Sequence, residues 1–336
     1  MVANVGLVPD CRHGLGGPSS FQRKLHGELS KRGLKPCYDL EQGELDVLMV
    51  INATRHLPYL WRAKSRGVPI IQRLGAPFLS STHLDISWAL RMRAWLGMRN
   101  IVHIRAHIAD RIVYQSRFVK ECWDRLHGET NKPSRVIYNG VDLSRFSPNG
   151  PRYVSKAEVC IISVEGTQRG PDDHPALALA QSLRNRGVDI ELLLFGRPFG
   201  NTGILWKEYP FVQLRGVVPN DDLPFFYRGS TLYLLTDIVN AGCPNSVIEA
   251  LACGAPVLGY ALSVLPEMLD PSAGRCVPAV GDPWKGVAPG NLDVLLSAAL
   301  EMVADNLSFR AGARRLAETR YGLTHMVDRY VDFFSQ

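Results

Sequence analysis

Short apolar runs alternate along the chain with stretches of helical periodicity, in two successive series, and this alternation restricts the fold more than any other feature. Buried parallel strands appear as continuous apolar runs, and each needs a helical crossover to reach the next. We therefore expect an α/β protein whose parallel sheets carry helices on both faces. The first series of runs is 2–8, 46–51, 68–72, 111–115 and 135–137. The second series is 159–163, 190–195, 211–214, 232–235, 256–260 and 274–277, with helices expected near 174–186, 245–252, 263–269 and 290–304.

A segment rich in turn-forming residues, 139–150, separates the two series of apolar runs. Such a segment suits a connection between domains. Because a domain commonly takes about 150 residues, a chain of 336 residues has room for two. Open parallel sheets bind ligands beyond the carboxyl ends of their strands, so we expect two similar domains with a ligand cleft between them.

The composition and the spacing of particular residues exclude several protein classes. Residues 1–10 lack a basic run before their apolar stretch, so no signal peptide is expected. No segment approaches about 18 uninterrupted apolar residues, which argues against a membrane-spanning helix. The seven cysteines form no Cys-x-x-Cys pair, which favours reduced thiols in a cytoplasmic protein. His103 and His107 alone have a metal-like spacing, and with no third ligand nearby no metal is expected.

The strongest chemical signal is the block 240–257, where an apolar run leads through a loop into a helix. Gly242 lets the backbone approach a ligand closely. The helix is expected to begin near Asn245 or Ser246, and the free N–H groups of its first turn suit the oxygens of a diphosphate or a sugar. Glu249 lies about one turn further on, where its carboxylate can accept hydrogen bonds from the adjacent hydroxyls of a ribose. A solvated glutamate in an ordinary strand–loop–helix joint is the alternative interpretation.

This block resembles the donor-binding segment of retaining glycosyltransferases of family four, which are group 1 enzymes with the GT-B fold. The family pattern Pro-Asn-x-x-x-Glu-Ala-x-Ala-x-Gly-x-Pro-Val matches the chain from Pro244 to Val257. Further segments that resemble the family follow in the expected order at 16–19, 137–148, 214–219 and 265–267. The resemblance implies two Rossmann-like parallel-sheet domains facing a cleft, with a C-terminal helix that crosses back to the first. The domain bounds are then 1–147 with 322–336 on the acceptor side, and 148–321 on the donor side.

By the same resemblance, Glu249 holds the ribose of the donor and Val218 lies against its base. The loop before Glu249 contacts the donor sugar and diphosphate, and the loop after the first strand approaches the phosphates and the acceptor. The residues at these positions are Gly242, Cys243, Pro244, Asn245 and Ser246 on the donor side, and Gly16, Gly17, Ser19 and Arg73 on the acceptor side.

The chain departs from the family pattern at three places. Ala241 stands where a second acidic residue usually helps to hold the donor sugar. The usual Arg…Lys pair that neutralises the departing diphosphate is reduced to Arg169, with Arg197 as a second candidate cation. A first-domain histidine is missing, and Arg73 is the polar residue nearest that position.

The resemblance implies a retaining, metal-independent glycosyltransferase that needs no cofactor. It would move a sugar from a nucleotide-sugar donor to a glycan or a lipid-linked acceptor, in cell-surface polysaccharide or glycolipid synthesis. The departures leave a second possibility: a catalytically silent GT-B protein that binds a nucleotide sugar or a partner enzyme. A nicotinamide-dependent enzyme is a further alternative, but the dinucleotide-like loop 14–19 has Ser19 at its third glycine position.

The distribution of charge differs between the two halves of the chain. Residues 1–150 hold 22 Lys and Arg against 12 Asp and Glu, whereas the remainder is acidic within a total net charge of +6. The segment 86–135 holds ten of the basic residues, interleaved with Trp88, Trp95 and Trp123. Basic and aromatic residues together suit an anionic membrane surface. A peripheral position on the inner face of the cell membrane is therefore expected, and no nucleic acid partner, because no recognised binding motif is present. The alternative is a set of solvated helix faces with tryptophans in the core.

Overall fold

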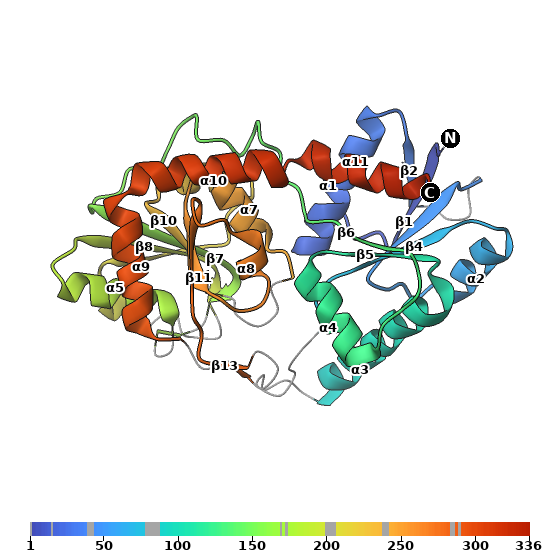
Figure 1. The fold of residues 1–336 in the computed structure, drawn as a ribbon, viewed down its shortest axis with the longest axis horizontal. Helices are drawn as coiled ribbons and strands as arrows, with labels where there is room; N and C mark the ends of the chain where they lie inside the picture. The colour runs from blue at the N-terminus through green and yellow to red at the C-terminus, as the bar shows by residue number, and fades with distance from the viewer. Residues whose placement is uncertain are drawn as a thin grey trace. The chain divides into compact units, whose positions relative to one another are not determined.

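The computed structural model divides the chain into two compact units (Figure 1). The first unit contains residues 1–140 and 323–336, and the second contains residues 141–322. The residues described are 2–14, 16–38, 44–77, 88–168, 170–171, 174–198, 206–236, 242–282, 286–287 and 290–336.

The first unit is built on a six-stranded sheet in which every strand is parallel to its neighbours, in the order β2-β1-β3-β4-β5-β6. Its strands are β1 (Asn4–Val8), β2 (Lys35–Cys37), β3 (Val47–Ile51), β4 (Ile70–Leu74), β5 (Arg111–Tyr114) and β6 (Ser134–Val136). Its helices are α1 (Gly17–Lys31), α2 (Leu57–Ser65), α3 (Trp88–His103), the π-helical turn η1 (Ile104–Ile108), α4 (Arg117–His127) and α11 (Leu323–Phe334). The strand order reverses between β1 and β3.

The second unit repeats this design with the strand order β12-β11-β10-β7-β8-β9, again parallel throughout. Its strands are β7 (Val159–Gln168), β8 (Ile190–Pro198), β9 (Val212–Gly216), β10 (Leu232–Leu235), β11 (Val257–Tyr260) and β12 (Gly274–Val277), and β13 (Gly281–Asp282) pairs with β14 (Gly286–Val287). Its helices are α5 (Pro175–Asn185), α6 (Leu223–Gly229), α7 (Asn245–Ala252), α8 (Leu265–Met268), α9 (Leu292–Ala304) and α10 (Asn306–Arg320). The strand order reverses between β7 and β10, which is the point where such sheets bind ligands.

Helix α11 belongs to the first unit although it ends the chain. It packs with α1 over one face of the sheet, where Met326, Val327 and Tyr330 are buried against Leu25 and Phe21. The apolar faces of both helices therefore form this core. Burial of these side chains is the main force that returns the end of the chain to the first unit.

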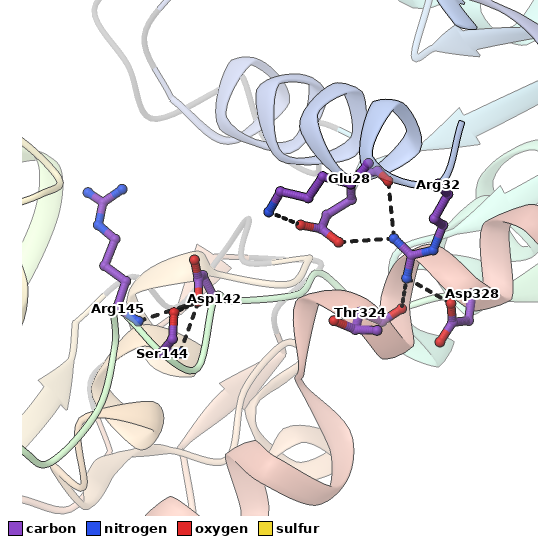
Figure 2. Close-up of polar contacts among 8 residues, drawn as sticks. Glu28, Arg32, Asp142, Ser144, Arg145, Thr324 and Asp328 are labelled. Atoms are coloured by element: carbon purple, nitrogen blue, oxygen red, sulfur yellow. Dashed lines mark hydrogen bonds and ion pairs between the residues drawn. The ribbon is translucent and has the colours of Figure 1, made fainter. Parts of the chain in front are cut away.

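A polar contact at the edge of this core also joins α1 to α11 (Figure 2). The guanidinium of Arg32, at the end of α1, donates to the carboxylate of Asp328 at 2.8 Å and to the carbonyl of Thr324 at 3.2 Å. The same side chain donates to Glu28 at 3.0 Å, which holds it in place. Arg32 is therefore the polar link between these two helices in the described part of the unit.

The boundary between the units differs from the expected one by a few residues. Residues 141–147, expected in the first domain, lie in the second unit. Val141 donates its N–H to the carbonyl of Tyr321 and bridges Gly322, which ties this segment to the end of α10. In the turn that follows, Asp142 accepts hydrogen bonds from the backbone and the hydroxyl of Ser144 (Figure 2).

No described helix combines the length and the apolar composition needed to cross a membrane.

Candidate functional site

The reversal of strand order in the second unit brings the end of β10 beside the first turn of α7. Helix α7 begins after Pro244, and no side chain caps its first N–H groups among the residues described. These N–H groups and the helix dipole together favour an anion at this end of the helix. Residues Gly242 and Cys243 lead into the helix and are buried, whereas Pro244, Asn245 and Ser246 are half-buried.

Glu249 lies one turn inside α7 and is only 3% exposed. Both of its carboxylate oxygens accept hydrogen bonds from the side-chain amide of Asn220, at 3.3 and 3.2 Å. A buried carboxylate requires such partners because its desolvation is costly. Asn220 is an exposed residue shortly after β9, so the carboxylate points toward the loop that contains Val218. Glu249 is therefore an enclosed, oriented hydrogen-bond acceptor and not a solvated helix residue.

Two tyrosines pack behind this carboxylate. Tyr227 of α6 is fully buried, and its burial, followed by the negative charge of Glu249, raises the pKa of its hydroxyl well above the usual range. The hydroxyl therefore stays neutral. The rings of Tyr233 and Tyr227 meet edge to face, with their centroids 6.0 Å apart. The hydroxyl of Tyr233 donates to the hydroxyl oxygen of Ser246 at 2.8 Å. Ser246 is thus held in a fixed position at the start of α7.

A buried hydroxyl pair joins the two strands between which the order reverses. The hydroxyl oxygens of Ser163, in the middle of β7, and of Thr236, next to the end of β10, are 3.1 Å apart. Sequence patterns did not reveal this pair, because a single Ser or Thr in or after a strand carries no distinctive spacing. Asn220 was missed too, although it comes two residues after Val218, which was expected to lie against the base.

Of the two arginines expected to neutralise the diphosphate, the structure describes Arg197. This residue is exposed near the carboxyl end of β8, in register with Thr167 of β7. Arg169 and Ala241 lie outside the described residues.

A pocket of about 650 Å³ opens beside the half-buried Val218, and its walls include Phe225 and Phe226.

In the first unit, the loop after β1 leads into α1 with a backbone that requires glycine. Gly16 has φ of 94°, and Gly17 begins the helix, whose first turn has no side-chain cap among the described residues. Ser19 is 3% exposed, and a Cβ on Gly14 would lie 2.6 Å from its hydroxyl oxygen. The loop therefore packs tightly over Ser19 and leaves Gly16 and Gly17 exposed.

Arg73 differs from the expectation that placed it with this ligand-contacting loop. Its side chain is 1% exposed, with the guanidinium 3.7 Å above the Phe21 ring. It donates to Asn139 at 2.6 Å and to the Tyr330 hydroxyl at 3.1 Å. The side chain leaves β4 on the same face as Ile71, and that face is covered by α1 and α11. Arg73 therefore lies beneath the loop, where it can position its neighbours.

Across the described residues, no group of three or more His, Cys, Asp and Glu side chains is arranged to hold a metal ion.

Two family descriptions match separate parts of the chain. "Glycosyltransferase Family 4" matches residues 21–145, and "Glycosyl transferases group 1" matches residues 175–303. The chain is 27% identical over 141 residues to WcaL of Escherichia coli K12, a protein named for colanic acid biosynthesis, and 27% identical over 138 residues to O-antigen chain mannosyltransferase B of Escherichia coli. These matches cover 39% and 38% of this chain, and only about a third of each relative, at 34% and 32%.

Solved structures match over nearly the whole chain. Sucrose-phosphate synthase from Thermosynechococcus elongatus has a TM-score of 0.71 at 14% identity and covers 99% of this chain and 98% of its own. HepE from Anabaena, crystallised with UDP-glucose, has a TM-score of 0.69 at 13% identity and covers both chains fully. At these identities the likeness concerns the fold alone, and it agrees with the two parallel-sheet units described above.

Proposed function

The chain belongs to the group 1 glycosyltransferases with the GT-B fold, and from that premise we propose that it is a retaining, metal-independent enzyme. It transfers a sugar from a nucleotide-sugar donor to a glycan or lipid-linked acceptor. The observation that carries the proposal is the buried carboxylate of Glu249, one turn inside α7 at the strand-order reversal of the second unit. The carboxylate enclosed there provides acceptors for sugar hydroxyls, and the backbone N–H groups of the first turn of α7 provide donors for phosphate oxygens.

The second unit binds the donor in this proposal. Glu249 accepts hydrogen bonds from the two hydroxyls of the ribose, and Val218 lies against the base. The backbone from Gly242 through Cys243, Pro244 and Asn245 to Ser246 contacts the donor sugar and the diphosphate. Asn220 orients the carboxylate before the nucleotide arrives. A uridine nucleotide is the first donor to test, since HepE was crystallised with UDP-glucose.

The proposed chemistry requires little from acid–base side chains. The acceptor hydroxyl oxygen bonds to the anomeric carbon on the face that the diphosphate leaves, while the bond from that carbon to the diphosphate oxygen breaks. A diphosphate oxygen takes the hydroxyl proton. The protein then contributes positioning and stabilises the negative charge that grows on the leaving group. We assign that electrostatic role to Arg197 and Arg169.

The first unit receives the acceptor. Gly16 and Gly17, where the loop after β1 enters α1, approach the acceptor, and Ser19 in the first turn of α1 supports the loop from below. Arg73 contacts Phe21 and Tyr330 beneath the loop. The names of the relatives, colanic acid and O-antigen, support a place in the synthesis of a cell-surface polysaccharide or glycolipid. Such an acceptor would be met at the cytoplasmic face of the membrane.

A nucleotide-release assay tests this proposal when a panel of nucleotide sugars is combined with lipid-linked and free glycan acceptors in EDTA. We expect release of nucleoside diphosphate, and a product whose anomeric configuration by NMR equals that of the donor. An inverted product would contradict the retaining mechanism. Donor binding without release of nucleoside diphosphate across the panel would favour the silent GT-B protein. The alanine at position 241, where the family usually has an acidic residue, also favours that alternative.

A further inference from the structure

Helix α3 carries an apolar stripe that the described fold leaves uncovered. Trp88, Met92, Trp95 and Leu96 lie on one side of the helix at spacings of four, seven and eight residues from Trp88, and they are 75%, 37%, 51% and 54% exposed. Trp61 of the neighbouring helix α2 is 45% exposed and approaches the end of α3 through a ring contact with His103. We call these five side chains the α3 stripe. Large apolar groups gathered on one surface mark a site of interaction.

The stripe is not the part of α3 that packs on its own unit. Further along the helix, Met98, Ile101 and Val102 pack against a buried core cluster. The side-chain amide of Asn100 donates to the carbonyl of Thr54 at 2.8 Å, which fixes the helix to the loop after β3. Figure 1 shows α3 along the lower edge of its unit. The helix is therefore held by its C-terminal half and presents the exposed side chains of the stripe along its N-terminal half.

The charge beside the stripe is positive. Helix α3 contains Arg91, Arg93 and Arg99 and no acidic residue. Arg93 is exposed, and the guanidinium of Arg99 lies 4.6 Å above the ring of Trp95. Arginines that flank exposed tryptophans on a helix are typical of an element lying in the headgroup region of an anionic bilayer.

Several other charges of the basic segment 86–135 are engaged within the protein. Arg105 and Lys120 both pair with Asp124, at 3.1 and 2.5 Å. Lys132 donates to the carbonyl of Arg105 at 2.6 Å. Trp123, which the sequence grouped with the surface tryptophans, is 1% exposed and donates its indole N–H to the carbonyl of Gly75. The fold thus removes these four residues from the membrane-facing candidates of the segment, whereas the exposed tryptophans of α3 and the arginines beside them remain.

We propose that the α3 stripe inserts into the interface of an anionic phospholipid bilayer, with Arg93 and Arg99 against the lipid phosphates. The proposal rests on the proposed function in that a lipid-linked acceptor requires the enzyme at a membrane. Bilayer binding itself requires no turnover. Each arginine near the surface contributes about fivefold to partitioning, and this contribution falls as salt rises.

Vesicle co-sedimentation of the full chain tests the proposal. Vesicles of equal parts phosphatidylglycerol and phosphatidylcholine are compared with pure phosphatidylcholine, at low and high salt. We expect binding to the anionic vesicles only, and a loss of roughly tenfold or more in partitioning for Trp88→Ala/Trp95→Ala. Arg93→Gln/Arg99→Gln should lose a similar factor and most of the salt dependence. Leu307→Ala, at a residue 84% exposed on α10, is the matched control and should bind as the wild type does.

Nucleotide binding by calorimetry accompanies each variant, so that a failure of the membrane proposal is distinguished from a failure of the proposed function. The tryptophan variant should bind the donor as the wild type does. Absence of wild-type binding to anionic vesicles, or unchanged binding of the tryptophan variant, would overturn the proposal. A wild-type dimer in solution that Trp88→Ala/Trp95→Ala dissociates would also overturn it, because the stripe would then be covered by a second copy.

Discussion

Asn220 and Glu249 form the polar contact on which the proposed donor site depends. The amide orients the buried carboxylate in the absence of ligand, and a hydrogen bond to an ionised carboxylate contributes about 1.5–3 kcal/mol. Asn220→Ala should therefore raise the dissociation constant of the donor by roughly ten- to a hundredfold. Calorimetric titration with UDP-sugars measures this, with Asn185→Ala on α5 as an exposed control. An affinity equal to that of the wild type would show that Asn220 does not orient the site.

Arg197 is the described cation to which we assign stabilisation of the leaving diphosphate. Removing one donor that acts on developing negative charge costs about 10²–10³ in rate. We expect Arg197→Ala to reduce kcat by that factor, with a smaller change in the KM of the donor, and Arg197→Lys to recover part of the rate. Steady-state kinetics would measure this, with Arg184→Ala as an exposed arginine control. If Arg197→Ala kept the kcat of the wild type, another residue would have to stabilise the leaving diphosphate.

Individual residues also show which parts of the candidate site sequence patterns could predict. Glu249 could be located because it stands at a fixed distance from Pro244 and Asn245 on one helix. Asn220 reaches it only because β9 and β10 belong to one sheet, and no local pattern records that. Arg73 lies near the end of β4, and the sequence pattern does not say on which face of the sheet its side chain lies. Only the packing of α1 and α11 over that face explains its burial.

At the scale of elements, Arg32 links α1 to α11. Its contacts to Asp328 and Thr324 are partly exposed, so their loss should cost about 1 kcal/mol or less of global stability. The local effect should be larger, because the first turns of α11 lose their contact with Arg32. We predict that Arg32→Ala speeds amide hydrogen exchange within α11, whereas Lys31→Ala does not, since Lys31 contacts Glu28 of its own helix. Unchanged exchange in α11 would show that Arg32 does not hold the helix in place.

Asp46 makes the start of the first sheet sensitive to pH. Its carboxylate accepts hydrogen bonds from the N–H groups of Ala3 and Asn4 at 2.7 and 2.8 Å, and the bond from Asn4 is the larger cause that lowers the pKa of Asp46. A lowered carboxyl pKa stabilises the fold above the unfolded pKa, about 4, and this contribution is lost as the pH falls through the folded pKa. Asp46→Asn should therefore unfold at lower urea than the wild type at neutral pH. The difference should shrink below about pH 4, and a constant difference would contradict this account.

Most elements could be predicted because buried parallel strands appear in the sequence as continuous apolar runs. The strands expected at 232–235 and 274–277 have those bounds in the structure. Strand β2 and the β13–β14 pair were not among the expected apolar runs, because β2 contains Lys35 and Pro36 and each of the other two strands has only two residues. The outward face of α3 was not separable from its core-facing side, because periodicity gives a stripe but not what covers it.

At the scale of the whole molecule, the charge asymmetry now has a structural account. The second unit is acidic overall, so the proposed donor diphosphate would have to be held locally by the first turn of α7 and by a few arginines. In the basic first half, α3 carries Arg93 and Arg99 beside exposed tryptophans. The two-domain organisation could be expected from the repeated alternation, and the turn-rich segment located the division approximately. The division at residues 140 and 141 depends on the contact of Val141 with Tyr321 and Gly322, which are far away in the sequence.

The most direct test of the central claim is calorimetric titration of the wild type and Glu249→Ala with a panel of UDP-, GDP- and ADP-sugars in EDTA. The account predicts saturable binding of at least one donor by the wild type. Two hydrogen bonds to an ionised carboxylate contribute about 1.5–3 kcal/mol each, so Glu249→Ala should weaken binding by roughly a hundredfold or more. Equal affinity in the folded variant, or no donor bound by the wild type, would contradict the placement of the site.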